Sequence, residues 1–233
     1  MTHPLLLLPG LVCDRFVWAA QESALASEFD VRARHDFYAY DSIAAMAQAV
    51  LGSAPPRFHV AGHSMGGRVA FEIVRMAPAR VASLIVLSTG TDPLQPGEAE
   101  RRQALVAIAN ARGMAALAQA WLPTTVAPAR LADAPFMAAL TGMVCRATPE
   151  IFARQIHALI HRPDARPLLP RIACPTLVMV GGADTYSPPA RHEEIAATVP
   201  GAELCIAEGA GHMLPLEAPT AVTAALGAWL GRR

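Results

Sequence analysis

The chain has 233 residues, of which 53% are hydrophobic and 16% are charged, so it can bury the core of one domain, or of a core with an inserted piece. Lysine plus arginine and aspartate plus glutamate both total 19, which excludes the basic surface that nucleic acid or an anionic membrane requires. The four cysteines are widely spaced and form no disulfide or metal-binding pattern. We therefore expect a cytoplasmic protein with a small, weakly charged or apolar partner and with no metal or organic cofactor.

The first part of the chain alternates between strand-like and helix-like segments. A continuous apolar run at 5–8, which Pro9-Gly10 ends, is typical of a strand buried on both faces. In chain order, the sequence then predicts a helix at 14–28, an edge strand at 31–34, a helix from about 42 to 51, a strand at 57–61, a helix at 68–76 and a strand at 81–87.

The pattern changes between residues 92 and 171, where no strand is predicted. Prolines divide this block into helical segments at 97–112, 114–122, 128–146 and 149–162. Alternation then resumes, with a strand at 176–180, a helix at 188–198, a strand at 203–207 and a closing helix at 215–230. No uninterrupted apolar run reaches the roughly 18 residues of a membrane span, so none is expected.

This order of elements predicts an α/β fold with an open, mostly parallel, doubly wound sheet of about six strands. The helical block falls in the crossover between the fourth and fifth strands. Such sheets bind ligands at the carboxyl ends of their strands, so the block is expected to lie over that edge as a cap or lid. The predicted organisation is a core of residues 1–91 and 172–233 with a helical lid at 92–171.

The stretch GHSMG at residues 62–66 fits the pattern G-x-S-x-G and lies between a predicted strand and a predicted helix. In that setting a serine sits at a sharp, strained turn with its hydroxyl raised above the sheet. Side chains at Gly62 and Gly66 would collide with neighbouring backbone. The N–H of Met65 would lie at a helix N-terminus, where unpaired donors favour negative charge. Ser64 is therefore the candidate nucleophile, although the pentapeptide alone also fits an ordinary tight turn.

Two further residues complete a catalytic triad in the order that this architecture uses, which is serine, then acid, then histidine. Asp184 follows the fifth predicted strand in a glycine-rich loop, and His212 follows the sixth. Both are predicted at the carboxyl ends of strands, on the same edge as Ser64. Asp184 would orient His212, which would act as general base and then as general acid. Asp92, after the fourth strand, is the alternative acid, or it begins the linker to the lid.

The motifs LLLLPG, GHSMGG, GGADTYSPP and GAGHMLPLEAP together resemble those of the α/β-hydrolases. The chain is similar to the small bacterial esterase-like members near the proline iminopeptidase and biotin-pathway carboxylesterase branches. That family usually has two more strands before the first one predicted here, and it commonly has His-Gly where this chain has Pro9-Gly10. The resemblance implies an oxyanion hole formed by the main-chain N–H groups of Leu11 and Met65.

These residues predict a serine hydrolase that cleaves a small carboxylic ester or thioester through an acyl-enzyme on Ser64. The alternatives are a lyase or C–C bond hydrolase with the same triad, and a non-catalytic receptor for a small molecule. Arg68, which follows the elbow, is expected on the helix surface or in a salt bridge. The alternative comes from its position in S-x-G-G-R, which resembles that of the elimination enzyme in menaquinone synthesis, a relative that binds an acidic substrate. The neutral overall charge gives no independent support for a polyanionic substrate.

Overall fold

A six-stranded sheet, parallel throughout, forms the centre of the computed structural model, which describes residues 3–33 and 37–232. The strand order is β2-β1-β3-β4-β5-β6. The strands are β1 (Leu5–Leu8), β2 (Val31–Ala33), β3 (Phe58–His63), β4 (Val81–Leu87), β5 (Thr176–Gly181) and β6 (Glu203–Ala207). This sheet confirms the predicted fold class. Arg34, the last residue of the predicted edge strand, lies outside the described residues.

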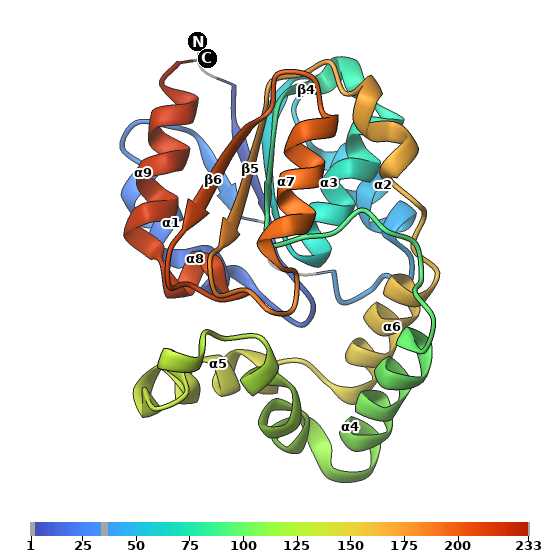
Figure 1. The fold of residues 1–233 in the computed structure, drawn as a ribbon. Helices are drawn as coiled ribbons and strands as arrows, with labels where there is room; N and C mark the ends of the chain where they lie inside the picture. Colours follow the sequence, from blue (N-terminus) through green and yellow to red (C-terminus); the bar gives the residue numbers. More distant parts are fainter. Residues whose placement is uncertain (1–2, 34–36, 233) are drawn as a thin grey trace.

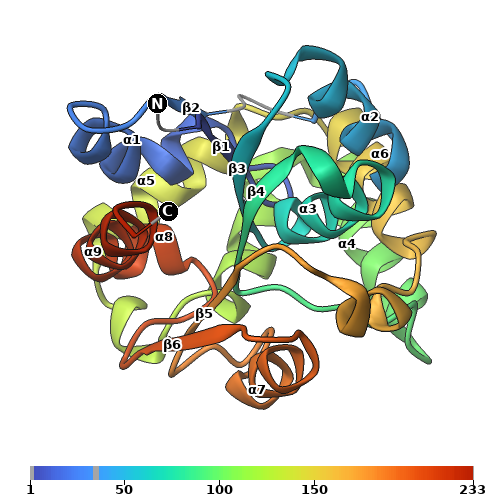
Figure 2. The same ribbon diagram turned by 90° about the horizontal axis from the view of Figure 1, so that it is seen from above.

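Helices cover both faces of the sheet, which explains why its central strands are buried along almost their whole length. The helices of the core are α1 (Ala19–Leu25), α2 (Ile43–Ser53), α3 (Met65–Met76), α7 (Pro189–Thr198), α8 (Leu214–Glu217) and α9 (Pro219–Leu230). Figures 1 and 2 show α1 and α9 on one face of the sheet and α2, α3 and α7 on the other. Every residue of β1, β3 and β5 is buried, whereas the edge strands β2 and β6 are more exposed.

Local backbone chemistry decides where several of these helices begin and end. Ser42 caps α2, because its hydroxyl accepts a hydrogen bond from the Ala45 N–H at 3.2 Å. The predicted closing helix is divided into α8 and α9 at Ala218, which has φ −129° and ψ 55°. A residue before proline is disfavoured in the helical region, so Pro219 accounts for the division.

The chain between β4 and β5 forms α4 (Glu98–Trp121), α5 (Ala134–Cys145) and α6 (Pro149–Ile160), with turns but no strand in this part of the structure. Figure 1 shows these helices beyond the tips of the strand arrows, apart from the helices that cover the sheet. Gly113, with φ 80° and ψ 173°, breaks α4 at the predicted boundary between two helices. The helix predicted from residue 128 begins at Ala134, because Asp133 caps it there. Residues 92–171 are called the helical segment below.

One stretch of the described chain, Glu98–Thr124, is long and apolar enough to cross a membrane by length and composition alone. This differs from the expectation that no such stretch exists, and a single one is weak evidence for a span. Gly113 breaks the helix within it. Several residues of this stretch also line the cavity described below. This supports its assignment to the helical segment and not to a membrane span.

Candidate active site

The turn between β3 and α3 has the geometry of a nucleophile elbow. Ser64 lies between the last residue of the strand and the first residue of the helix, with φ 54° and ψ −114°. A Cβ atom on Gly62 would lie 2.3 Å from the carbonyl oxygen of Gly66. A Cβ atom on Gly66 would lie 2.3 Å from the carbonyl oxygen of Leu8. Both neighbours are main-chain atoms, so only glycine fits at either position, as the sequence predicts.

A chain of hydrogen bonds joins the three predicted triad residues. The Ser64 hydroxyl donates to Nε2 of His212 at 2.9 Å, and Nδ1–H of His212 donates to Oδ2 of Asp184 at 3.0 Å. The other Asp184 oxygen, Oδ1, accepts from the main-chain N–H of Ser187 at 2.7 Å. Burial raises the pKa of Asp184, but the hydrogen bond and charge of His212 and the other donors lower it more, so the net shift is downward. Asp184 therefore stays ionised and fixes the His212 tautomer that leaves Nε2 free to accept.

The sheet accounts for this meeting of distant residues. Ser64, Asp184 and His212 follow β3, β5 and β6, whose carboxyl ends lie along one edge of a parallel sheet. Asp92, the alternative acid, lies elsewhere, with its Oδ2 atom 3.6 Å from Nη1 of Arg191. The structure thus brings Asp184, and not Asp92, to the histidine.

Backbone strain is concentrated around this edge. Among the described residues, three that are not glycine have positive φ: Val12 at 46°, Ser64 at 54° and Ser88 at 47°. Each follows the carboxyl end of a strand, namely β1, β3 and β4. Such conformations cost about 1–3 kcal/mol each and tend to occur at functional sites. A β-branched residue such as Val12 is especially unfavourable there.

The two predicted oxyanion donors, Leu11 and Met65, line the same cavity as Ser64 and His212. Met65 is the first residue of α3, so its N–H has no carbonyl of an earlier helical turn to bond. The Leu11 N–H forms no hydrogen bond within the described part of the chain. Both N–H groups therefore remain free to donate to a ligand.

A glutamate that sequence reasoning missed holds the histidine loop. Oε2 of Glu217 accepts from the N–H groups of Gly211 at 2.9 Å and Ala127 at 2.8 Å, and Oε1 accepts from Met213 at 3.0 Å. Gly211 and Met213 flank His212, and Ala127 belongs to the helical segment. Burial raises the pKa of Glu217, and these three N–H donors oppose the rise. An isolated acid within the apolar stretch HMLPLEAP was the available signal.

His63 supports the same loop from the elbow. Its Nε2–H donates to the carbonyl oxygen of His212 at 2.8 Å, and the two rings lie 5.5 Å apart. Burial, and secondly the charge of His212, lower the pKa of His63 to about 3, so this ring is neutral at physiological pH. His63 thus has a structural role, because it holds the loop that carries His212.

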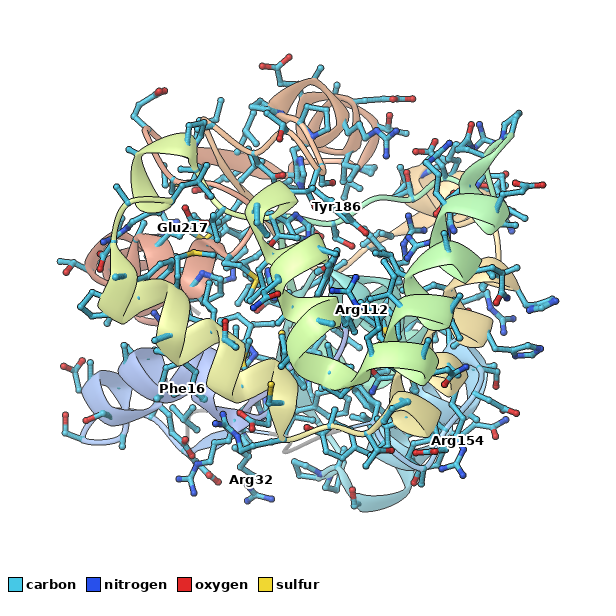
Figure 3. All side chains as sticks on the ribbon, turned by 90° about the horizontal axis from the view of Figure 1, so that it is seen from below. Phe16, Arg32, Arg112, Arg154, Tyr186 and Glu217 are labelled. Carbon is cyan, nitrogen blue, oxygen red and sulfur yellow. The ribbon has the colours of Figure 1, made fainter. Side chains whose placement is uncertain are left out.

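A cavity of about 490 Å³ opens at Ser64 and His212, between the core and the helical segment. Tyr186, which is 37% exposed, places its ring 4.7 Å from that of His212 at the core side of this cavity. Figure 3 shows the helical segment lying across the core, with Tyr186 and Glu217 near its border. Arg68 also lines the cavity, which corrects the expectation of a helix-surface residue. The described residues form no group of three or more histidine, cysteine or acidic side chains that could hold a metal ion.

Comparisons with known proteins agree with this geometry. The sequence profile described as "Alpha/beta hydrolase family" matches residues 5–226. A thermophilic esterase from Thermogutta terrifontis, with malate bound, is 31% identical and has a TM-score of 0.88, with 99% of this chain and 90% of that chain covered. The enol-lactonase from Burkholderia xenovorans LB400 is 25% identical and has a TM-score of 0.89, with 99% and 92% covered.

A shorter match covers only part of the chain. The pimeloyl-[acyl-carrier protein] methyl ester esterase of Klebsiella pneumoniae (strain 342) is 36% identical over 92 residues, which are 36% of each chain. These relatives are esterases and a lactonase, so the comparisons support hydrolase activity.

Proposed function

The chain belongs to the alpha/beta hydrolase family, and we propose that within it this protein is a serine hydrolase that cleaves a small carboxylic ester or thioester. The observation that carries the proposal is the unbroken hydrogen-bonded chain from Ser64 through His212 to Asp184. The Ser64 end of these hydrogen bonds opens on a cavity of about 490 Å³, a size that suits a small ligand.

In the first half-reaction, His212 takes the proton of Ser64 as Oγ attacks the carbonyl carbon of the substrate. The negative charge that develops on the carbonyl oxygen faces the N–H groups of Leu11 and Met65. Asp184 stabilises the imidazolium without itself taking the proton. His212 then gives its proton to the leaving alcohol or thiol, and the acyl group stays on Ser64.

In the second half-reaction, His212 takes a proton from water, which attacks the acyl-enzyme. The same N–H groups stabilise the second oxyanion, and the proton returns to Ser64 as the acid leaves. Loss of one such donor typically costs about 100- to 1000-fold in rate. No step of this cycle requires a metal or an organic cofactor. The helical segment acts as the lid that shapes the acyl pocket.

The test is the rate of p-nitrophenyl butyrate hydrolysis by the wild type and by Ser64→Ala. We expect kcat to fall by about 10⁴-fold or more, because the nucleophile is lost. Ser53→Ala, an exposed serine at the end of α2, is the matched control and should keep the wild-type rate. A fluorophosphonate probe should add its mass to the wild type and not to Ser64→Ala. Undiminished turnover by Ser64→Ala would refute the mechanism.

A further inference from the structure

The cavity beside Ser64 carries a concentration of positive charge that the composition of the whole chain conceals. Among the described residues, five guanidinium groups and one carboxylate, that of Glu98, line it. The arginines come from four separate places in the chain: Arg68, Arg101, Arg102, Arg162 and Arg191. Only the fold brings them together.

Glu98 neutralises part of this charge at the inner wall. Arg162 donates to both of its oxygens, at 2.8 Å and 2.6 Å, and Arg102 donates to Oε1 at 2.8 Å. Burial raises the pKa of Glu98, but the hydrogen bonds from Arg162, Gln95 and Arg102 lower it by more. The net result is a pKa of about 2. The Glu98 carboxylate therefore pairs with Arg162 and Arg102 and, among the residues that the structure describes, forms no ion pair with the other three arginines of the cavity.

Arg68 and Arg191 converge above Gly90. A Cβ atom on this glycine would lie 3.0 Å from Nη2 of Arg68 and 3.8 Å from Nη1 of Arg191. Nη1 of Arg68 donates to the main-chain carbonyl of Asp92 at 2.9 Å, and no carboxylate within the described chain forms an ion pair with Arg68. Arg191 has only a 3.6 Å approach to the Asp92 carboxylate. The two guanidinium groups thus present free N–H donors to the cavity.

Arg68 and Arg101 are the least compensated members of the set. Burial, and then the charges of Arg162 and Arg102, lower the pKa of Arg68 to about 9, which leaves it charged at neutral pH. Arg101 is exposed at the cavity, and its side chain forms no ion pair within residues 3–33 and 37–232. Guanidinium groups crowded in this way favour an anion among them.

We propose that this cavity selects esters whose acyl group ends in a carboxylate, held by Arg68 and Arg191 over Gly90 and attracted by Arg101. This assignment rests on the proposed serine hydrolase function. A carboxylate can accept two parallel N–H bonds from a guanidinium group, which gives direction as well as charge. Because Gly90 has no side chain, both guanidinium groups can lie close to its backbone.

The site lies beside the part of the enzyme that carries the acyl group. Gly90 follows Thr89, whose hydroxyl donates to the main-chain carbonyl of Ser64 at 2.7 Å. Ser64, Arg68 and Arg191 line the same cavity, so an acyl group attached to Ser64 stays within that cavity through both half-reactions, whereas the alcohol leaves after the first. We assign the anionic end to the acyl group, and not to the leaving alcohol, for this reason.

The test compares monomethyl glutarate with methyl pentanoate, which has a methyl group in place of the carboxylate. Hydrolysis of both is followed by pH-stat titration. We expect the wild type to prefer monomethyl glutarate in kcat/KM by about tenfold to a hundredfold, the range that one or two charge-assisted hydrogen bonds provide. Arg68→Met and Arg101→Gln should reduce this ratio, and Arg68→Lys should restore part of it. Arg112→Gln, on the exposed surface of α4 and outside the cavity, is the matched control and should leave the ratio unchanged.

A binding measurement separates this inference from the proposed function. Calorimetry with glutarate on folded Ser64→Ala protein requires no turnover. Weaker binding by about tenfold or more in the double variant Ser64→Ala, Arg68→Met would support the anion site even if ester hydrolysis proved not to depend on Ser64. Conversely, Ser64-dependent hydrolysis with an equal preference for the two esters, and no glutarate binding, would overturn the anion site alone. Arg101→Gln guards against a folding defect at Arg68, because its side chain is exposed.

Discussion

Replacement of Glu217 is the sharpest test of how the histidine loop is held. Its carboxylate accepts three main-chain N–H groups, two of which flank His212 and one of which belongs to the helical segment. In Glu217→Gln, the amide oxygen can keep the two bonds that Oε2 accepts. The amide NH₂ group then faces the N–H of Met213, so one buried donor loses its acceptor.

The structure sets the size of the effect. An unpaired buried donor costs about 1–3 kcal/mol, so Glu217→Gln should lower the free energy of unfolding by that amount. For a chain of this length, this corresponds to a decrease in Tm of about 2–12 °C. Glu217→Ala removes both acceptor oxygens, leaves all three N–H donors unpaired and should cost about 3–5 kcal/mol. Since a shift of about 1 Å in a catalytic group costs on the order of a hundredfold, we expect kcat of Glu217→Gln to fall by about tenfold to a hundredfold.

Urea unfolding followed by tryptophan fluorescence measures the first quantity, and p-nitrophenyl butyrate hydrolysis measures the second. Glu193→Gln, an exposed glutamate on α7, is the matched control and should behave as the wild type. If Glu217→Gln unfolded at the wild-type urea concentration and kept the kcat of this control, the carboxylate would not position His212.

Two further changes test the elbow and the pH dependence of stability. Gly66→Ala forces a Cβ atom to within 2.3 Å of the Leu8 carbonyl oxygen and should abolish the soluble, folded protein. Gly52→Ala, on α2 with nothing within 4 Å, should instead stabilise it by about 0.5–1 kcal/mol in urea unfolding, and equal effects would contradict the reasoning. Burial lowers the pKa of His192 to about 4, and Nε2 of the neutral ring accepts a hydrogen bond from the Thr89 N–H at 2.9 Å. With a folded pKa below the unfolded value, its contribution is complete above about pH 6.5 and is lost as the pH falls toward 4, by up to about 3 kcal/mol. Urea unfolding at several pH values should show that the free energy of unfolding falls less between about pH 6.5 and 4 in His192→Gln than in the wild type. An equal fall in both proteins would count against this assignment.

The sheet was largely predictable because its signals are local. β1, β4 and β6 occupy the predicted residues, since each is a short apolar or alternating run bounded by turn residues. The two parts of α4 meet at Gly113, where the predicted helices were divided. The 3₁₀ turn at Arg15–Trp18, at the start of a predicted helix, could not be read in this way, because hydrogen-bond register does not appear in apolar periodicity.

The three residues of the hydrogen-bonded chain were predictable for the same reason, because each follows a recognisable strand. The arginines of the cavity were not. Arg68 was expected on the helix surface or in a salt bridge, with contact to an acidic substrate only as the alternative. The other four arginines come from α4, from the turn after α6 and from α7. Their meeting depends on how the helical segment packs on the core, and equal totals of positive and negative charge give no sign of it.

The bond between Gln155 of α6 and Val12 has a consequence for how such a protein can change over evolutionary time. Gln155 Oε1 accepts the Val12 main-chain N–H at 2.7 Å in a buried position, next to the proposed oxyanion donor Leu11. A shortened chain that joined β4 directly to β5 would keep the elbow but would release the strained loop after β1. Specificity and rate are therefore not independent modules: exchange of the helical segment for that of another hydrolase must also supply an acceptor for Val12.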